Sequence, residues 1–382
     1  MRTAATVVAL AVSGCAQPAP APPTRPDGAT PAPFPSTTAS DPVPVATNGP
    51  ASSETATAAA APAPAPIDPC AAAEPRPAVE QKSLRGFDVG RDGRLYWAVG
   101  SDPTAIYSLD ATTVTGEPKL ELKTDGFKDY ASEMVAGREG FWLAASSLYS
   151  AAVCGDKMTW IPRGGGRPVV LGGPSCLDGP RPARGGVDVV WATSPNIGGT
   201  LRFFLGMGPA SLASVSAIPG VIATDLEAVV HEADALYVGK ENTLFRKGHG
   251  EEPQTLSIFY GGEIASLDLR EGHVFAVVRE DYRRYIVFDV PPDGKRKELT
   301  RIETRASTAR IRVGEGFAAL AIHGSGDDQA SKLVLIDTSG QCPPRELPPM
   351  KLASSTLRVH GRHLFVERET GIDVVRWGPP TP

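Results

Sequence analysis

The sequence predicts an all-β fold, and three observations carry this prediction. A short apolar segment with an aromatic residue near its start recurs seven times between residues 83 and 377. Each copy follows a turn that contains glycine or an acidic residue, as a tight β-hairpin requires, and further strand-like segments flank it. No stretch shows sustained helical periodicity, so a parallel α/β arrangement is excluded.

The spacing of the repeat indicates the architecture. The copies recur about every 45 residues, with one gap near 38, when they are aligned on Tyr96, Trp142, Val190, Tyr237, Phe275, Ala319 and Phe365. A unit of this length has room for four short strands, which is typical of a β-propeller blade. We therefore expect a β-propeller over residues 80–378 with seven four-stranded blades. A six-bladed ring stays open, because the third repeat is poorly formed.

The four strands of a unit can be placed along the chain. Residues 267–269 illustrate the first strand, and the aligned segment is the second. The second strand reads as nearly continuously apolar, because neighbouring blades bury both of its faces. Residues 106–110 and 119–122 illustrate the third and fourth strands. The seventh unit ends at Trp377 without a fourth strand, so we expect residues 76–82 to complete it.

The first fifteen residues have the features of an export signal. Arg2 precedes a short apolar stretch, residues 4–12, which is too short to cross a bilayer as a helix. The Val-Ser-Gly-Cys sequence that ends at Cys15 resembles the lipobox of bacterial lipoproteins. The resemblance implies cleavage before Cys15 and a lipid on its sulfur, which would anchor the chain in a membrane. An ordinary signal peptide with an incidental cysteine is the alternative.

The resemblance to lipoproteins also implies a location in the cell envelope. Ala16 stands where an aspartate resembles a signal for retention in the inner membrane, so the outer membrane is favoured. Residues 16–79 are dominated by Pro, Ala, Thr and Ser. Such a segment lacks the apolar surface needed to offset ordering entropy, so we expect a disordered tether before the propeller. Residues 379–382 form a short tail.

Four cysteines remain beyond Cys15, an even number that suits an oxidising compartment. Three pairings are possible, and we favour Cys154 with Cys176 and Cys70 with Cys342. The second bridge would join the start of the folded region to its far end. The spacing of cysteines and histidines fits no zinc site.

Some repeats loosely resemble the bacterial propellers with YWTD repeats. Residues 95–99 followed by 106–110 are similar to the strand pair of that family, and residues 160–171 look like the turn between its outer strands. The resemblance spans about residues 83–377 and implies a propeller. The Thr-Asp of the motif is absent throughout, and propellers of that family usually have six blades.

Composition and motifs narrow the function classes. The net charge is -5, so there is no basic footprint for nucleic acid. The folded region has no nucleophile elbow, HExxH, P-loop or dinucleotide fingerprint. The tryptophans fall mostly on predicted strand cores, where packing explains them.

The candidate site is the central channel, on the loops that lead into the innermost strands. The polar residues expected there are Asp88, Glu133, Asp225, Glu227, Asp268, Arg310, Arg312 and Arg358. Converging carboxylates and arginines suit a calcium ion or an anionic ligand. Polar side chains also line any water-filled channel, and this structural explanation is favoured. No other cofactor is expected.

Two further features have a structural interpretation. His360 and His363 flank a turn and are expected to be exposed. Asp327 and Asp328 lack the additional acids of a calcium loop, so a hairpin tip is expected.

The function favoured at this point is a tethered, non-enzymatic binding module for an envelope protein, peptide or glycan. A metal-dependent hydrolase or lyase with carboxylate ligands at the channel is the alternative. Convergence of three or more of the five acids at one mouth would favour the enzyme, and arginines between them would count against it.

Overall fold

The computed structural model describes a series of segments between residues 70 and 378. These are residues 70, 72, 74–100, 104–124, 131–145, 157–171, 176–183, 188–194, 202–206, 213–215, 226–232, 235–248, 250–281, 283–304, 308–323, 331–348 and 352–378. The chain divides into two compact units, and all of these residues belong to the second, Pro64–Pro382. None of the described helices is long and apolar enough to span a membrane.

The described strands form seven antiparallel sheets of four strands each. Blade 1 consists of β2 (Leu84–Val89), β3 (Arg94–Val99), β4 (Thr104–Asp110) and β5 (Lys119–Thr124). Blade 2 consists of β6 (Ala131–Ala136), β7 (Gly140–Ala145), β8 (Lys157–Pro162) and β9 (Val169–Leu171). Blade 3 consists of β10 (Cys176–Pro182), β11 (Val189–Ser194), β12 (Arg202–Gly206) and β13 (Ala213–Val215). Blade 4 follows a single 3-10 turn, η1 (Leu226–Ala228), and consists of β14 (Val229–Glu232), β15 (Ala235–Lys240), β16 (Thr243–Gly248) and β17 (Gln254–Ile258).

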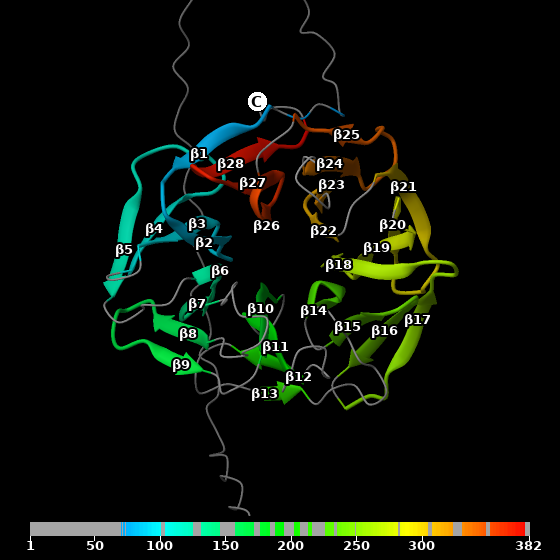
Figure 1. Cartoon of the computed structure of the whole chain (residues 1–382), viewed down its shortest axis with the longest axis horizontal. Helices are drawn as coiled ribbons and strands as arrows, with labels where there is room; N and C mark the ends of the chain where they lie inside the picture. The colour runs from blue at the N-terminus through cyan, green and yellow to red at the C-terminus, as the bar shows by residue number, and fades with distance from the viewer. Residues whose placement is uncertain are drawn as a thin grey trace, which may run out of the picture. The chain divides into compact units, whose positions relative to one another are not determined.

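The remaining blades follow in chain order around the ring. Blade 5 consists of β18 (Glu263–Arg270), β19 (His273–Asp281), β20 (Arg284–Val290) and β21 (Lys297–Glu303). Blade 6 consists of β22 (Thr308–Val313), β23 (Phe317–His323), β24 (Lys332–Asp337) and β25 (Arg345–Glu346). Blade 7 consists of β26 (Leu352–His360), β27 (His363–Arg368), β28 (Gly371–Arg376) and β1 (Arg76–Glu80). Figure 1 shows the sheets arranged around a common centre, with β2, β6, β10, β14, β18, β22 and β26 innermost. The expected seven-bladed propeller is confirmed.

The second strand of each blade supplies much of the core, as its apolar sequence predicts. Trp97, Trp142 and Phe365 lie on β3, β7 and β27, and each is at most 1% exposed. The apolar clusters join neighbouring blades: one of them packs Tyr96 of blade 1 against Met134 and Phe141 of blade 2. A blade therefore buries its faces only against its neighbours, which explains why the ring must close.

The β18–β19 turn shows how the glycines of the repeat act. Glu271 and Gly272 form a two-residue turn, and both have positive φ angles, 54° and 80°. This geometry matches the right-handed twist of the flanking strands and favours glycine at the second position.

The N-terminal strand closes the ring. β1 pairs antiparallel with β28, and Figure 1 shows the blue strand beside the red one. Ala72 forms a further bridge with Trp377. The prediction that residues near 76–82 complete the last blade is therefore confirmed. Composition had assigned residues 16–79 to the linker, but residues 76–79 belong to β1. The composition of a Pro-rich and Ala-rich segment does not reveal a strand.

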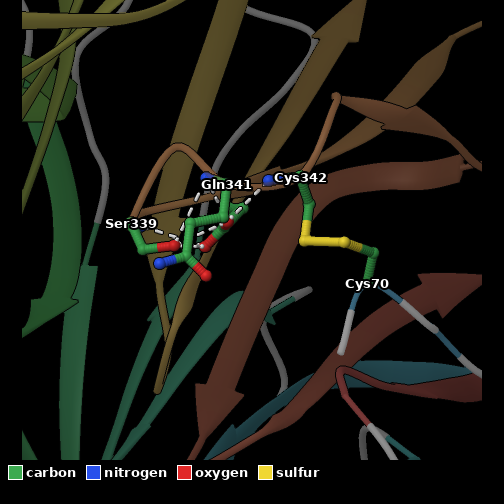
Figure 2. Close-up of a disulfide and its surroundings, with 5 residues drawn as sticks. Cys70, Ser339, Gln341 and Cys342 are labelled. Atoms are coloured by element: carbon green, nitrogen blue, oxygen red, sulfur yellow. Dashed lines mark hydrogen bonds between the residues drawn. A yellow bond between two sulfur atoms is a disulfide. The ribbon is translucent and has the colours of Figure 1, made fainter. Parts of the chain in front are cut away.

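A disulfide fastens this closure to blade 6. Cys70 is bonded to Cys342, which lies between β24 and β25 (Figure 2). Asp337 orders the turn by accepting hydrogen bonds from the backbone amides of Gln341 and Cys342, at 2.8 and 2.9 Å. The predicted pairing of Cys70 with Cys342 is confirmed.

Several sequence predictions lie outside the described residues. They concern Cys15, residues 16–69 of the tether, Cys154, Asp225, Asp327, Asp328 and the tail 379–382. The side chain of Cys176 is not described either.

Candidate functional site

Most of the polar residues expected at the channel lie on innermost strands where the structure describes them, and four of them occupy equivalent positions. Asp88, Asp268, Arg312 and Arg358 each face the aligned position of the neighbouring second strand: Tyr96, Phe275, Ala319 and Phe365. They therefore stand at one level of the ring, on blades 1, 5, 6 and 7. Glu133 lies on β6 and Glu227 on η1.

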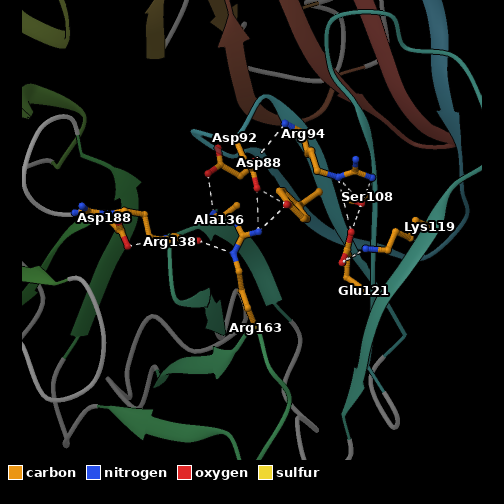
Figure 3. Close-up of polar contacts among 12 residues, drawn as sticks. Asp88, Asp92, Arg94, Ser108, Lys119, Glu121, Ala136, Arg138, Arg163 and Asp188 are labelled. Carbon is orange, nitrogen blue, oxygen red and sulfur yellow. Dashed lines mark hydrogen bonds and ion pairs between the residues drawn. The ribbon is translucent and has the colours of Figure 1, made fainter. Parts of the chain in front are cut away.

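Asp88 and Arg358 form a buried ion pair across the junction of blades 1 and 7. Arg358 Nε lies 2.8 Å from Asp88 Oδ1, and both side chains are at most 6% exposed. The second carboxylate oxygen, Asp88 Oδ2, accepts a hydrogen bond of 2.8 Å from the Ala136 amide of blade 2, as Figure 3 shows. Arg358 also donates to the Leu357 and Met134 carbonyl oxygens. The pair thus links three consecutive blades.

Arginines also contact Glu133 and Glu227, two further acids of the channel. Arg312 donates from Nη1 and Nη2 to the carboxylate of Glu227, at 3.3 and 3.4 Å. Arg310 Nε lies 3.5 Å from Glu227 Oε1, and Arg310 Nη1 lies 3.9 Å from Glu133 Oε1. Blade 6 therefore supplies two guanidinium groups that contact carboxylates on β6 and η1.

Contacts between a side chain and a backbone amide also tie β18 to the next innermost strand, β22. Asp268 Oδ2 of β18 accepts a hydrogen bond of 2.6 Å from the Val313 amide of β22. Ser266 of the same strand accepts one from the Ile311 amide, at 3.2 Å. Asp88 makes the same kind of contact with the Ala136 amide. These side chains therefore accept hydrogen bonds from backbone amides of the next blade that do not pair with a strand of that blade.

Burial and charge act in opposite directions on this network. Burial raises the pKa of the Asp88 carboxyl, although Arg358 and the Ala136 amide favour its charged form. Burial likewise raises the pKa of Glu133, against the attraction of Arg358 and Arg310. Burial disfavours the charge on Arg312, but Glu227, Asp268 and Glu133 together raise its pKa above the ordinary value. The surrounding carboxylates therefore favour the charged form of Arg312.

A second set of contacts supports the same face of blades 1 and 2. The Tyr96 hydroxyl lies 2.6 Å from Asp92 Oδ2 and 2.6 Å from Arg163 Nη1. Arg138 donates to Asp188 from its amide and its Nε, at 2.8 and 3.1 Å. These contacts fix the turns beside the channel.

An axial cavity of about 410 Å³ opens where the innermost strands turn into the second strands. Its wall includes Asp88, Asp268, Arg91, Arg270, Arg312, Arg358, His231 and His360. The sequence placed the site on the loops that lead into the innermost strands, at the opposite ends of those strands. For this cavity the predicted placement is wrong. Asp88, Asp268, Arg312 and Arg358 instead stand close to the turns that follow the innermost strands.

Several wall residues were not singled out as channel residues. Arg91, Arg270 and His231 lie in or beside turns, where no periodic pattern distinguishes a side chain that faces the axis from one that faces solvent. His360 was expected to be an exposed turn residue, yet it is half-buried and lines the cavity. His363 pairs with it across the turn, and burial and the nearby Arg376 lower its pKa.

The acids do not converge as a metal site would require. Among the described residues, no group of three or more His, Cys, Asp or Glu side chains could hold a metal ion. Asp88, Glu133, Glu227 and Asp268 instead contact arginines or backbone amides. Asp225 lies outside the described residues.

The fold relates this chain to known structures, whereas sequence comparison does not. No protein-family model and no curated protein matches it. A prolyl endopeptidase chain is 15% identical with a TM-score of 0.50, over 79% of this chain and 51% of that one, so this chain spans about half of its length. An inactive virginiamycin B lyase from Staphylococcus aureus, with quinupristin, is 13% identical with a TM-score of 0.51, over 78% of this chain and 96% of that one. At these identities the likeness shows the fold alone, and that fold is a β-propeller.

Proposed function

We propose that this chain is a lipid-tethered binding module of the bacterial cell envelope that takes a small ligand in the axial cavity. The observation that carries the proposal is the cavity itself. Side chains from several blades converge on a volume of about 410 Å³, which lies within the usual range for sites that hold small molecules. The ring is closed by a strand and a disulfide, so the wall is preorganised.

The contacts of the channel acids favour binding over catalysis. A general acid, base or nucleophile must be able to reach a substrate, whereas these carboxylates hold arginines or backbone amides between blades. They maintain the shape and charge of the wall. The metal-dependent hydrolase or lyase that the sequence left open loses support for the same reason.

The anchor of the proposed module rests on the sequence alone. The lipobox-like segment ending at Cys15 and the following linker support an envelope protein held at a distance from the membrane. Metabolic labelling with an alkyne fatty acid provides the test: the wild-type chain takes up the label and sediments with membranes, and Cys15→Ser does neither. Labelling that persists in Cys15→Ser would contradict the anchor.

Ligand-observed NMR of the full chain tests the binding site. The probes are a set of small anionic, cationic, neutral sugar and peptide fragments. We expect at least one to bind the wild-type chain and to lose binding in His360→Trp, which places a larger side chain in the cavity. Thr255→Trp is the matched control, because it adds the same indole on the outer strand β17. Binding that is equal in both variants would contradict the proposed site.

A further inference from the structure

The wall of the axial cavity carries more positive than negative charge. Among its described residues, four arginines stand against two aspartates. Both aspartates accept hydrogen bonds from backbone amides of the next blade, Asp88 from Ala136 and Asp268 from Val313. The carboxylates of Asp88 and Asp268 therefore lie partly against the blade junctions, whereas the guanidinium groups of the four arginines line the cavity.

The four arginines fall into two pairs with different surroundings. Arg312 and Arg358 are at most 10% exposed in their side chains and are held by Glu227 and Asp88. They are fixed charges at the base of the cavity. Arg91 and Arg270 lie at its rim, where a ligand enters.

The side chains of the rim arginines are more exposed than those at the base, 39% for Arg91 and 29% for Arg270. Arg270 pairs with Glu271 at 2.9 Å, but that glutamate side chain is 77% exposed, and such surface pairs contribute little stability. Arg91 donates to the Ala183 carbonyl oxygen, and its Nη2 lies 3.9 Å from Asp188 Oδ1, beyond hydrogen-bond distance. Burial and the neighbouring Arg138 lower the pKa of Arg91, against the attraction of Asp188.

We propose that the axial cavity binds a compact anion with two or more carboxylate or phosphate groups, held between the rim arginines and the arginines at its base. The assignment rests on the proposed binding function and names its ligand class. Guanidinium groups bind carboxylate and phosphate through paired hydrogen bonds, and the four here come from blades 1, 5, 6 and 7. Arginines spread over four blades suit a ligand with several anionic groups better than one with a single charge. His231 and His360 add ring nitrogens to the same wall.

Isothermal titration calorimetry on the full chain tests the ligand class. Citrate represents several carboxylates and pyrophosphate represents phosphate, while glucose and spermidine are the neutral and cationic probes. We expect citrate or pyrophosphate to bind, and the stronger of the two identifies the source of the anionic groups. Binding should weaken as salt rises, because salt screens charges at the partly exposed rim.

Variants of the rim locate the binding. Arg91→Gln and Arg270→Gln are each expected to weaken binding by roughly tenfold to a hundredfold, as loss of a charged hydrogen-bonding group does. Arg301→Gln is the matched control, since Arg301 lies on the outer strand β21 and pairs with Glu298 and Glu280. All three side chains are partly exposed, and thermal melting confirms that each variant folds.

The outcomes separate this assignment from the function on which it rests. No binding of either anion overturns the ligand class, as does anion binding that Arg91→Gln, Arg270→Gln and Arg301→Gln leave unchanged. If glucose or spermidine binds instead and His360→Trp abolishes that binding, the binding function stands and only the anion assignment falls. If no probe binds here and no fragment binds in the NMR experiment, both fail.

Discussion

At the scale of single residues, the Asp88–Arg358 pair places two opposite charges together across a blade junction. The Asp88–Arg358 pair is almost completely buried, and its remaining polar groups bind backbone carbonyl and amide groups. Removing two ions from water is costly, so such a pair stabilises the fold only while both partners are present. Loss of one partner leaves the other charge buried without an ion of opposite sign beside it.

This reasoning predicts the effect of Arg358→Met. We expect a loss of roughly 3–5 kcal/mol in the free energy of unfolding near pH 8, since Asp88 would remain buried without its cation. The loss should shrink towards pH 5. A carboxyl whose pKa is raised in the folded state stabilises the fold below its unfolded pKa and loses that contribution as pH rises through the folded value. Without Arg358 the pKa of Asp88 rises further, so the variant is penalised most at high pH.

Urea unfolding at several pH values measures this effect. The double variant Asp88→Asn/Arg358→Met serves as the control, because it removes both charges and should recover part of the lost stability. A loss that is the same at pH 5 and pH 8, or a double variant as unstable as the two single losses added together, would contradict the ion-pair account.

At the scale of elements, the repeat predicts the blades, but the sequence predicts only part of the candidate site. The second strands are buried on both faces, so their apolar runs are visible in the sequence. Asp88, Asp268, Arg312 and Arg358 were singled out as polar residues near the innermost strands, and the strand pairing shows that they occupy equivalent places. Arg91 and Arg270 could not, since both lie at turns.

Bulges are a second reason why the site was hard to predict. The pairing of the first with the second strand shifts in register between Leu84 and Phe87, between Ala131 and Glu133, and between Ile264 and Ser266. An extra residue in one strand changes which side chains face the channel from that point onward. Simple alternation therefore cannot assign the axial face of these strands.

The pairing of β28 with β1 depends on one glycine. Gly371 has a φ angle of 148°, and a Cβ at this position would overlap the carbonyl oxygen of Val79 on β1. We expect Gly371→Ala to cost about 3 kcal/mol, because it combines backbone strain with overpacking. Gly164→Ala is the matched control, since Gly164 has open space around it and no positive φ angle. Equal thermal stability of the two variants would contradict the role of Gly371 in closure.

At the scale of the whole molecule, the ring is held shut by segments that are far apart in sequence. Cys70 and Cys342 are separated by 272 residues. Nearby, Arg345 donates to the Ala72 carbonyl oxygen at 2.7 Å and pairs with Glu74 at 2.9 Å. These contacts hold the N-terminal strand against the last two blades.

The disulfide should contribute strongly to stability because it closes so long a loop. On the chain-entropy model we expect the double variant Cys70→Ser/Cys342→Ser to lose up to about 5 kcal/mol. Denaturant unfolding under non-reducing conditions measures the loss. The variant should still fold, because β1 keeps its pairing with β28. An unchanged unfolding midpoint would show that the bridge is dispensable for closure.

Amide hydrogen exchange of the full chain, with and without saturating citrate, tests most directly whether the axial cavity is the binding site. The proposed site predicts slower exchange with citrate at residues 88–91, 268–270 and 358–361, which line the cavity from blades 1, 5 and 7. Exchange on the outer strands β5, β17 and β21 should not change. Protection confined to those outer strands, or no protection anywhere, would contradict the assignment of the cavity.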